Sequence, residues 1–527
     1  MHKINEISHN TIYSLESEGS NLLNQKNQSH DTATILEETF EYDHLDLTLK
    51  NVSDVLAENA DVILRQIKIR NNPLLEVTLI YIDGLVAQDI ISDLVIKPLM
   101  QQEQFDSCIN QQEVVQLITA GNVYFAAIKR REKIGDLLND ILTGSAALIF
   151  DSLNLAVTFE AKGFEKRSIS EPTTENVIKG AKDSFVETLR VNTATCRRNI
   201  KSPNLVIEET IVGKQSMTPV AIVYMKNIAN KELVKEVKQR LDSINVDRII
   251  TAGYVEEFLI DNKNSVFPQV LYTERPDKFC SNIVDGRVGI IIDGLPITFI
   301  IPATFIMFLQ APEDYTQQYI IISIIRYIRY TAMFVTLLLP GFYVSITTFH
   351  LEMIPTELAI SIAASKEGVP FPMAIEIFIM LAAFELLVEA GLRLPKTIGQ
   401  AVSIVGAVVV GQSAVQAKLI SPATVVIIAL TAISGFTMPN QDFSNALRIW
   451  RFILFILGSL IGMFGLTSGL ILLIFQWCQM ETYGVSYLSP IVSDKNSQLN
   501  DTLFRFPLST MKYRPKELKD INKRRMK

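Results

Sequence analysis

The sequence has few of the residues that build redox, metal or catalytic centres. Of its 527 residues only four are cysteine and five are histidine. Cys108, Cys196, Cys280 and Cys478 form no CxxC pair and no metal spacing, so we expect reduced thiols. It also lacks a phosphate-binding glycine loop, a dinucleotide fingerprint, a nucleophile elbow and an HExxH helix. We therefore expect neither an enzyme nor a cofactor or metal.

The N-terminal region lacks the basic segment and apolar core of a secretory signal. Residues 1–40 are instead rich in Asn, Ser, Gln, Glu and His, with too few apolar residues to bury a core. This composition predicts a disordered arm. Without a secretory signal, the polar first half is expected to stay in the cytoplasm.

The rest of the polar half alternates helical and strand patterns. Residues 52–67 have helical periodicity, whereas 77–82 is a β-branched strand pattern. Similar alternation continues beyond a linker that contains Glu171-Pro172. The pattern predicts two α/β cytoplasmic subdomains, at 41–165 and 166–310.

Two short segments in these subdomains resemble one another. Residues 148–153 read LIFDSL and 290–295 read IIIDGL, and each is soon followed by Thr-Phe. Asp-Ser and Asp-Gly favour tight turns, so each segment predicts a β-hairpin. Lipid would leave the backbone at such a turn unsatisfied, so 288–302 is not expected to span a membrane. The match indicates either two related subdomains or convergent hairpin chemistry.

Long apolar runs are confined to the last third of the chain. Each approaches the roughly 20 residues that cross a bilayer as a helix. They predict a polytopic α-helical transmembrane domain over 320–480. With both chain ends in the cytoplasm the number of spans must be even, which four clean segments satisfy. These segments are 331–349, 400–417, 421–438 and 452–477.

Residues 371–392 are also long enough to span, but they contain Glu376, Glu385 and Glu389. Each ionised carboxylate near mid-bilayer costs about 2.5 kcal/mol or more. We expect this segment to lie in the interface or inside an assembly, with Glu385 and Glu389 as candidate gating or buried charges. Pro340 interrupts the first span and predicts a kink that makes this helix a candidate moving part.

A stripe of small or slim residues follows one side of the segment 399–417. It contains Ser403, Gly406, Val410 and Ser413. Small residues allow close helix packing in membranes. In a ring of identical subunits the same stripe could line a pore, with hydroxyls facing hydrated ions and Val410 as a dewetting constriction. The residues alone leave both interpretations open.

Basic and aromatic residues flank the membrane segments. Arg326 and Arg329, at the start of the first span, predict interfacial anchoring beside Tyr327 and Tyr330. The tail at 481–527 is basic, although the whole chain has a net charge of -7. It is expected in the cytoplasm, where it either solubilises the chain or lies on anionic lipid.

Ordered motifs over about 270–490 resemble the GerA family, and specifically the A subunit of the nutrient germinant receptors of spore-forming Firmicutes. The motifs are Asp285-Gly-Arg-Val-Gly289, Gln310-Ala-Pro-Glu-Asp-Tyr315, Pro355-Thr-Glu-Leu358, Ala363-Ala-Ser-Lys-Glu-Gly-Val-Pro-Phe-Pro372, Glu389-Ala-Gly-Leu-Arg-Leu-Pro395, Ile398-Gly-Gln-Ala-Val-Ser-Ile-Val-Gly406 and Pro439-Asn440. The first half fits the family's cytoplasmic domain more loosely.

The resemblance implies a location, partners and a mechanism. Family members lie in the inner membrane of the dormant spore, with a transporter-like B subunit that binds the nutrient and a lipoprotein C subunit. The A subunit is implied to form a homo-oligomeric ring, a pentamer, that conducts cations when nutrient is sensed. This favours the pore interpretation of the stripe. Membrane lipid is an expected partner and nucleic acid is not.

Three alternatives remain open. A related family member accompanies the channel that releases dipicolinic acid, and the motifs do not separate the two. A non-conducting scaffold would only hold the transporter and lipoprotein together. A secondary transporter would show paired broken helices in corresponding halves, and these unequal spans without inverted repetition argue against it.

Overall fold

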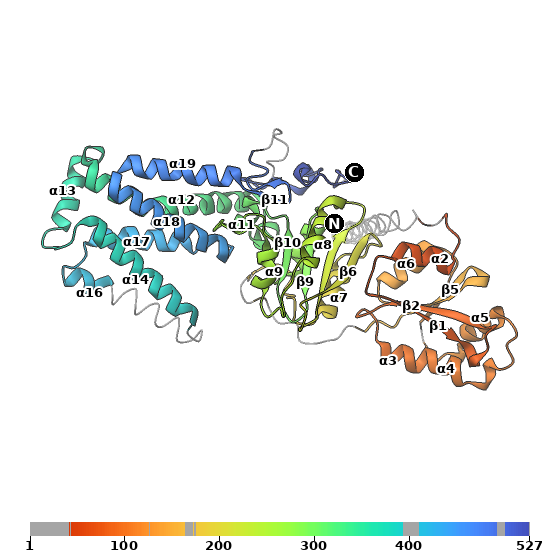
Figure 1. Cartoon of the computed structure of the whole chain (residues 1–527). Coiled ribbons are helices and arrows are strands. Elements are labelled where there is room, and N and C mark those ends of the chain that lie inside the picture. Colours follow the sequence, from red (N-terminus) through yellow and green to blue (C-terminus); the bar gives the residue numbers. More distant parts are fainter. Residues whose placement is uncertain are drawn as a thin grey trace, which may run out of the picture.

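The computed structural model describes residues 42, 44–125, 127–163, 172, 175, 177–393, 411–492 and 501–525. Three parts follow one another in space: a first sheet with its helices, a second sheet with its helices, and a helical region (Figure 1). The expected arm at 1–40 and the expected boundary at 165/166 lie outside the described residues.

The first part, which we call unit 1, is built on a five-stranded sheet in the order β1-β2-β4-β5-β3, with every pairing antiparallel. Every residue of β4 and β5 is buried, as expected for strands rich in Ala, Val, Leu, Ile and Phe inside a sheet. The elements are α2 (Leu49–Leu56), β1 (Val62–Lys68), β2 (Glu76–Ile82), α3 (Gln88–Ile91), α4 (Lys97–Gln101), α5 (Gln111–Leu117), β3 (Ile128–Arg131), α6 (Ile134–Leu142), β4 (Ala146–Phe150) and β5 (Leu155–Phe159).

The second part, unit 2, repeats this topology. Its strands follow the order β6-β7-β9-β10-β8, again antiparallel throughout. In both units a helix, α6 or α10, leads into the last hairpin. The elements are α7 (Leu189–Asn199), β6 (Leu205–Val212), β7 (Thr218–Met225), α8 (Lys231–Asp242), α9 (Ala252–Leu259), β8 (Leu271–Thr273), α10 (Pro276–Val284), β9 (Val288–Ile292) and β10 (Thr298–Ile301).

The two hairpins predicted from Asp-Ser and Asp-Gly are confirmed. Phe150 pairs with Leu155 across the first, and Ile291 pairs with Thr298 across the second. They occupy equivalent positions in two sheets of identical strand order. This shared topology supports related subdomains rather than convergent hairpin chemistry.

A buried ion pair joins unit 1 to unit 2. Arg197 of α7 is fully buried, and its Nε and Nη2 each lie 2.8 Å from a carboxylate oxygen of Asp61, just before β1. Nη2 also donates to Asn59 Oδ1 at 2.6 Å, and Nη1 donates to the Leu205 carbonyl at 2.7 Å. A buried guanidinium is tolerable when its donors are satisfied in this way. The two units are therefore held together at this point.

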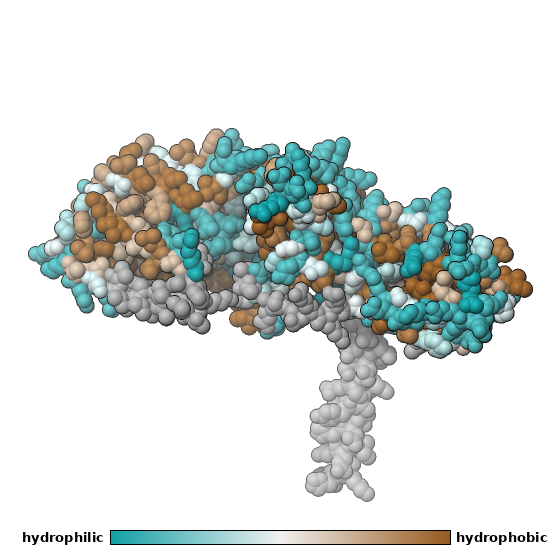
Figure 2. Space-filling view, turned by 60° about the horizontal axis from the view of Figure 1, so that its bottom comes forward, coloured by the Kyte–Doolittle hydropathy of each residue, from teal (hydrophilic) through white to brown (hydrophobic). Residues whose placement is uncertain are grey.

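The helical region is centred on α12, which packs against α17, α18 and α19. Within the described residues, α12 and α18 are long and apolar enough to cross a membrane. Apolar side chains gather on the outside of this region (Figure 2). The elements are α11 (Phe305–Leu309), α12 (Tyr319–Phe349), α13 (Thr356–Ser365), α14 (Met373–Arg393), α16 (Gly411–Gln416), α17 (Pro422–Gly435), α18 (Gln441–Ile461) and α19 (Met463–Gln479).

The expected single span at 452–477 is wrong. The chain breaks at Gly462, whose φ of 66° favours glycine, and α19 then folds back along α18. Apolar residues continue on both sides of this glycine, so hydropathy alone does not reveal the turn. Of the other expected spans, 331–349 lies within α12, and 421–438 contains a helix of 14 residues. Most of 400–417 lies outside the described residues.

The C-terminal segment 501–525 packs against unit 2 and the base of α12. Arg514 Nε donates to the Val284 carbonyl at 3.0 Å, and Arg525 pairs with Asp285. Arg505 Nη1 donates to the Gln317 carbonyl at 2.8 Å. Neither the solubilising nor the lipid-bound interpretation of the tail anticipated these contacts, since the partners lie about 200 residues earlier in the chain.

Candidate functional site

Unit 2 and the helical region share one apolar core. Phe305 of α11 contacts Phe443 of α18 and Trp477 of α19, with ring centroids 5.4 and 4.9 Å apart. Phe308 stacks on Phe443 at 6.0 Å, and Tyr487 lies against both phenylalanines of α11. The same cluster continues into the sheet of unit 2 and into α12. A displacement of either part therefore disturbs packing in the other.

Beside this core, buried charges hold the base of α12. Asp314 Oδ2 accepts from Arg326 Nε at 2.9 Å and from Arg329 Nη1 at 3.1 Å, and its Oδ1 accepts from Arg329 Nη2 at 3.2 Å. Arg326 also reaches Asp501 Oδ1 at 2.8 Å. The side chains of Asp314 and Arg326 are each 1% exposed. We call these four residues the α12 base cluster.

The α12 base cluster corrects the expectation that Arg326 and Arg329 are interfacial anchors. Both guanidinium groups are enclosed by protein rather than extended toward headgroups. Sequence reasoning missed this because Asp314 and Asp501 come from separate segments, one a 3-10 turn (Pro312–Tyr315) and the other the C-terminal segment. A charge that precedes an apolar run looks the same whether its partner is a lipid or a distant carboxylate.

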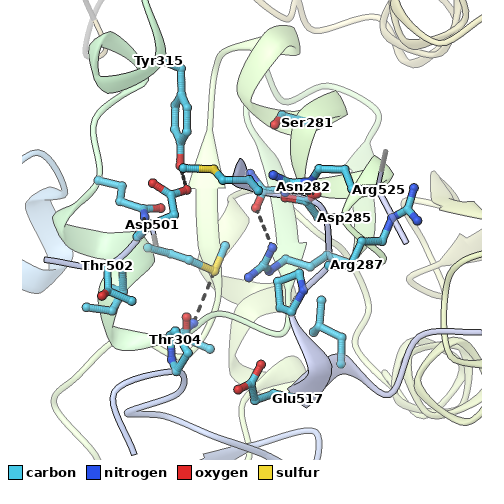
Figure 3. A pocket seen from close by; sticks show the side chains of 18 of the residues that line it. Ser281, Asn282, Asp285, Arg287, Thr304, Tyr315, Asp501, Thr502, Glu517 and Arg525 are labelled. Carbon is cyan, nitrogen blue, oxygen red and sulfur yellow. Dashed lines mark hydrogen bonds and ion pairs between the residues drawn. The ribbon is translucent and has the colours of Figure 1, made fainter. Parts of the chain in front are cut away.

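A cavity of about 410 Å³ opens next to this cluster, between unit 2 and the C-terminal segment (Figure 3). At one end the Tyr315 hydroxyl donates to Asp501 Oδ2 at 2.6 Å, which links the cavity to the α12 base cluster. At the other end Arg287 Nη1 donates to Asn282 Oδ1 at 3.2 Å, and Arg525 pairs with Asp285.

Burial dominates the electrostatics around this cavity. It raises the pKa of the Tyr315 phenol well above its usual range, and the Asp501 carboxylate raises it further. Burial also lowers the pKa of Arg287. Behind the cavity wall, burial raises the pKa of Asp520 to about 7, although Arg287 and Arg514 oppose the shift. Among these groups, Arg287 is a wall residue whose charged side chain is buried.

The structure separates the two glutamates that were predicted as gating or buried charges. Glu385 is half-buried and pairs with Arg451 of α18, with Arg448 at 3.8 Å. Glu389 is exposed and pairs at 2.6 Å with Arg393 on its own helix. Glu385 therefore joins α14 to α18, whereas the ion pair of Glu389 among the described residues stays within α14.

The predicted kink residue Pro340 is buried in α12 beside a close helix contact. Gly341 faces α18 so closely that an added Cβ would lie 3.1 Å from the Leu454 carbonyl oxygen. Ser345 Oγ donates to the Gly341 carbonyl at 2.6 Å and also lies 3.2 Å from the Gly458 carbonyl. The Ser345 hydroxyl thus lies between a carbonyl of α12 and a carbonyl of α18, about one turn after the proline.

The predicted pore stripe is described only in part. Ser413 is exposed on α16. Ser403, Gly406 and Val410 lie outside the described residues, so their role stays a prediction.

Glu376 has a structural role that the sequence did not reveal. Its side chain is fully buried, and Oε2 accepts from the Ser421 backbone N–H at 2.9 Å, at the start of α17. Lys366 lies 3.8 Å from Oε1. A carboxylate at a helix N-terminus is favoured by the helix dipole. Glu376 thus caps α17 from α14, and the Ser421-Pro422 helix start was the available signal.

The fold and site define a protein with two α+β units, the second of which is coupled through a shared core and buried charges to an apolar helical region. The model of the family described as "Bacillus/Clostridium GerA spore germination protein" matches residues 50–517. The chain belongs to this family.

Named relatives agree with this assignment. The chain is 39% identical to spore germination protein KA of Bacillus subtilis over 477 residues, which cover 90% of this chain and 87% of the relative. It is 31% identical to stage V sporulation protein AF of B. subtilis, over 74% of this chain and 79% of the relative. A crystal structure of the N-terminal domain of the A subunit of the Bacillus megaterium spore germinant receptor GerK3 is 31% identical, with a TM-score of 0.40, over 50% of this chain and 97% of that one.

Proposed function

We propose that this chain is the A subunit of a spore nutrient germinant receptor, and that it oligomerises in the spore inner membrane into a nutrient-gated cation channel. Its partners are a transporter-like B subunit and a lipoprotein C subunit. The proposal starts from the family match over residues 50–517. Identity of 39% with germination protein KA, against 31% with stage V sporulation protein AF, favours the receptor over the paralogue that accompanies dipicolinic acid release.

The observation that carries the channel proposal is the charge group on α14 and α18. The side chains of Glu385, Arg448 and Arg451 are 27%, 18% and 1% exposed in a region whose outer surface carries many large apolar side chains. Ionisable groups at membrane depth are expensive toward lipid and usually face a bundle interior or a water-filled path. We infer that a neighbouring subunit or an aqueous pathway covers Glu385 in the assembly.

The helix lengths also support an assembly. α17 has 14 residues, or about 21 Å at 1.5 Å per residue, which is short for a hydrocarbon core of about 30 Å. A short helix is best accommodated when protein, rather than lipid, surrounds it. In a ring, the stripe with Ser403, Gly406, Val410 and Ser413 would then face the centre.

Potassium flux tests this function. The chain is purified with its B and C partners and reconstituted in liposomes loaded with potassium. We expect potassium efflux when the nutrient is added, and none from liposomes that lack this chain. A complex that assembles fully and binds nutrient, but gives no flux above empty liposomes, would favour the non-conducting scaffold.

A further inference from the structure

The cavity between unit 2 and the C-terminal segment has the size and the unmatched charges of a ligand site. Its volume of about 410 Å³ falls within the range of roughly 300–1,000 Å³ typical of small-molecule sites. Its walls include residues of α10, Arg287 just before β9, residues of α11, the turn Pro312–Tyr315 and the C-terminal segment 501–525 (Figure 3). Segments far apart in the sequence therefore converge on one space.

Most charged side chains that line the cavity have a partner within the protein. Asp285 pairs with Arg525, and Asp501 pairs with Arg326. At the rim, Asp277 pairs with Arg275 and Lys278 pairs with Glu175. Lys512 and Lys516 are exposed to solvent at the outer edge. These groups need no ligand.

Arg287 is different, because no carboxylate in the described part of the chain lies within ion-pair distance of it. Its side chain is buried, and its Nε and Nη1 donate to neutral oxygens, the Pro302 carbonyl at 3.3 Å and Asn282 Oδ1 at 3.2 Å. A buried guanidinium normally gains a charged partner, since neutral acceptors compensate only part of its lost hydration. Asp285 and Asp520 act on Arg287 through space, but neither forms an ion pair with it. The cavity thus offers a guanidinium without a direct ionic partner among the described residues.

Glu517 is the opposite case. It lies in the short 3-10 helix Lys516–Leu518 of the C-terminal segment, and both of its carboxylate oxygens are buried. Neither oxygen has a hydrogen-bond partner among the described residues. A carboxylate without donors loses hydration with no compensation. Figure 3 shows Glu517 and Arg287 on different sides of the cavity.

We propose that this cavity binds a small water-soluble molecule carrying both an anionic group and a protonated amine, with the anion at Arg287 and the amine at Glu517. Each end of such a molecule supplies the direct ionic partner that Arg287 or Glu517 lacks among the described residues. A membrane lipid is a poorer fit, because the cavity is lined by residues outside α12, whereas exposed isoleucines begin at Ile320 of α12.

Such a ligand would connect the C-terminal segment to unit 2. The cavity is also lined by Tyr315 and Asp501, and Asp501 holds Arg326 at the base of α12. Occupancy would therefore stabilise the contacts that couple unit 2 to α12. The proposal does not depend on channel activity, since binding can be measured on the isolated chain.

Thermal unfolding of the full-length protein in detergent tests the proposal. The probes are the ω-amino acids from glycine to 6-aminohexanoate, which separate the two charges by increasing lengths. Butyrate and butylamine, each lacking one charge, serve as controls. We expect at least one ω-amino acid to raise the unfolding midpoint saturably, because a ligand that binds only the folded state stabilises it. Butyrate and butylamine should need at least tenfold higher concentrations.

Glu517→Gln makes the test specific. Glu517 has no hydrogen-bond partner in the part of the chain that the structure describes. The neutral variant should therefore be at least as stable as the wild type without ligand, yet bind the ω-amino acid at least tenfold more weakly. Glu389→Gln, an exposed change on α14, should keep the full ligand shift. The proposal is overturned if no member of the series shifts the midpoint, if butyrate or butylamine act equally well, or if Glu517→Gln retains the shift.

Discussion

Removal of the Asp314 carboxylate should uncouple α12 from unit 2. Asp314 accepts three hydrogen bonds from Arg326 and Arg329, and it is buried with Arg326. Loss of one partner of a buried ion pair costs about 3–5 kcal/mol, because the remaining charge is buried without a compensating partner. Without Asp314, Arg326 still pairs with Asp501 at 2.8 Å, whereas the remaining partner of Arg329 among the described residues is the Leu309 carbonyl at 2.6 Å. Asp314→Asn, which still accepts, should therefore cost about 3 kcal/mol, and Asp314→Ala about 5 kcal/mol.

The assay is the thermal unfolding midpoint of the full-length protein in detergent. At roughly 2–4 °C per kcal/mol, Asp314→Asn should lower the midpoint by about 10 °C. Glu389→Gln is the matched control and should stay within about 0.5 kcal/mol, because its pair is exposed. The double variant with Arg329→Met should lose less than the two single changes together, since both charges are then absent. A loss below about 1 kcal/mol for Asp314→Ala would refute the idea that this cluster couples the two parts.

Three further predictions follow from individual contacts. Glu385→Gln should impair nutrient germination at normal protein abundance, whereas Glu389→Gln should not. The reason is that, of these two glutamates, Glu385 is the one that joins α14 to α18. Equal germination of both variants would contradict this. Asp520 has a pKa of about 7 in the folded chain, whereas its ordinary value is 3.8. The folded state therefore favours protonated Asp520, and the stability that this protonation contributes is fully present below about pH 4 and is lost as pH rises through 7. Unfolding midpoints at pH 5 and pH 8 should differ less in Asp520→Asn than in the wild type, and an unchanged difference would argue against a buried Asp520. Gly462→Ala should destabilise the α18–α19 turn by about 1–3 kcal/mol. Gly462 has a φ of 66°, and a new Cβ would lie 3.1 Å from Phe349 Cβ. An unchanged unfolding midpoint would show that the turn tolerates a side chain.

Local chemistry was enough to predict the features that depend on neighbouring residues. The hairpin at Asp293-Gly294 was predictable because the turn residues and both strands lie within a few positions of each other. The resemblance between the two Asp turns left related subdomains and convergent hairpin chemistry open, and the repeated strand order of the two units favours related subdomains.

Features that depend on distant partners were not predictable. The Arg326 pattern fits a lipid anchor equally well, and Asp501 lies 175 positions later. Gly462 sits inside a continuous apolar run, where a turn and a helix have the same hydropathy. Glu517 gave no signal at all, because an isolated carboxylate in a basic tail normally lies in solvent. Such assignments require the folded chain rather than the local pattern.

The most direct test of the channel proposal is potassium release from dormant spores that carry Val410→Ala. If Val410 forms the dewetting constriction of a pore, the smaller side chain should hydrate it and let potassium leak without nutrient. Leu386→Ala, an exposed apolar truncation on α14, is the matched control and should not leak. At matched protein abundance, spontaneous potassium release from Val410→Ala spores is the predicted result. Reduced abundance of the assembled complex with no leak would contradict the pore and indicate that the stripe only packs helices.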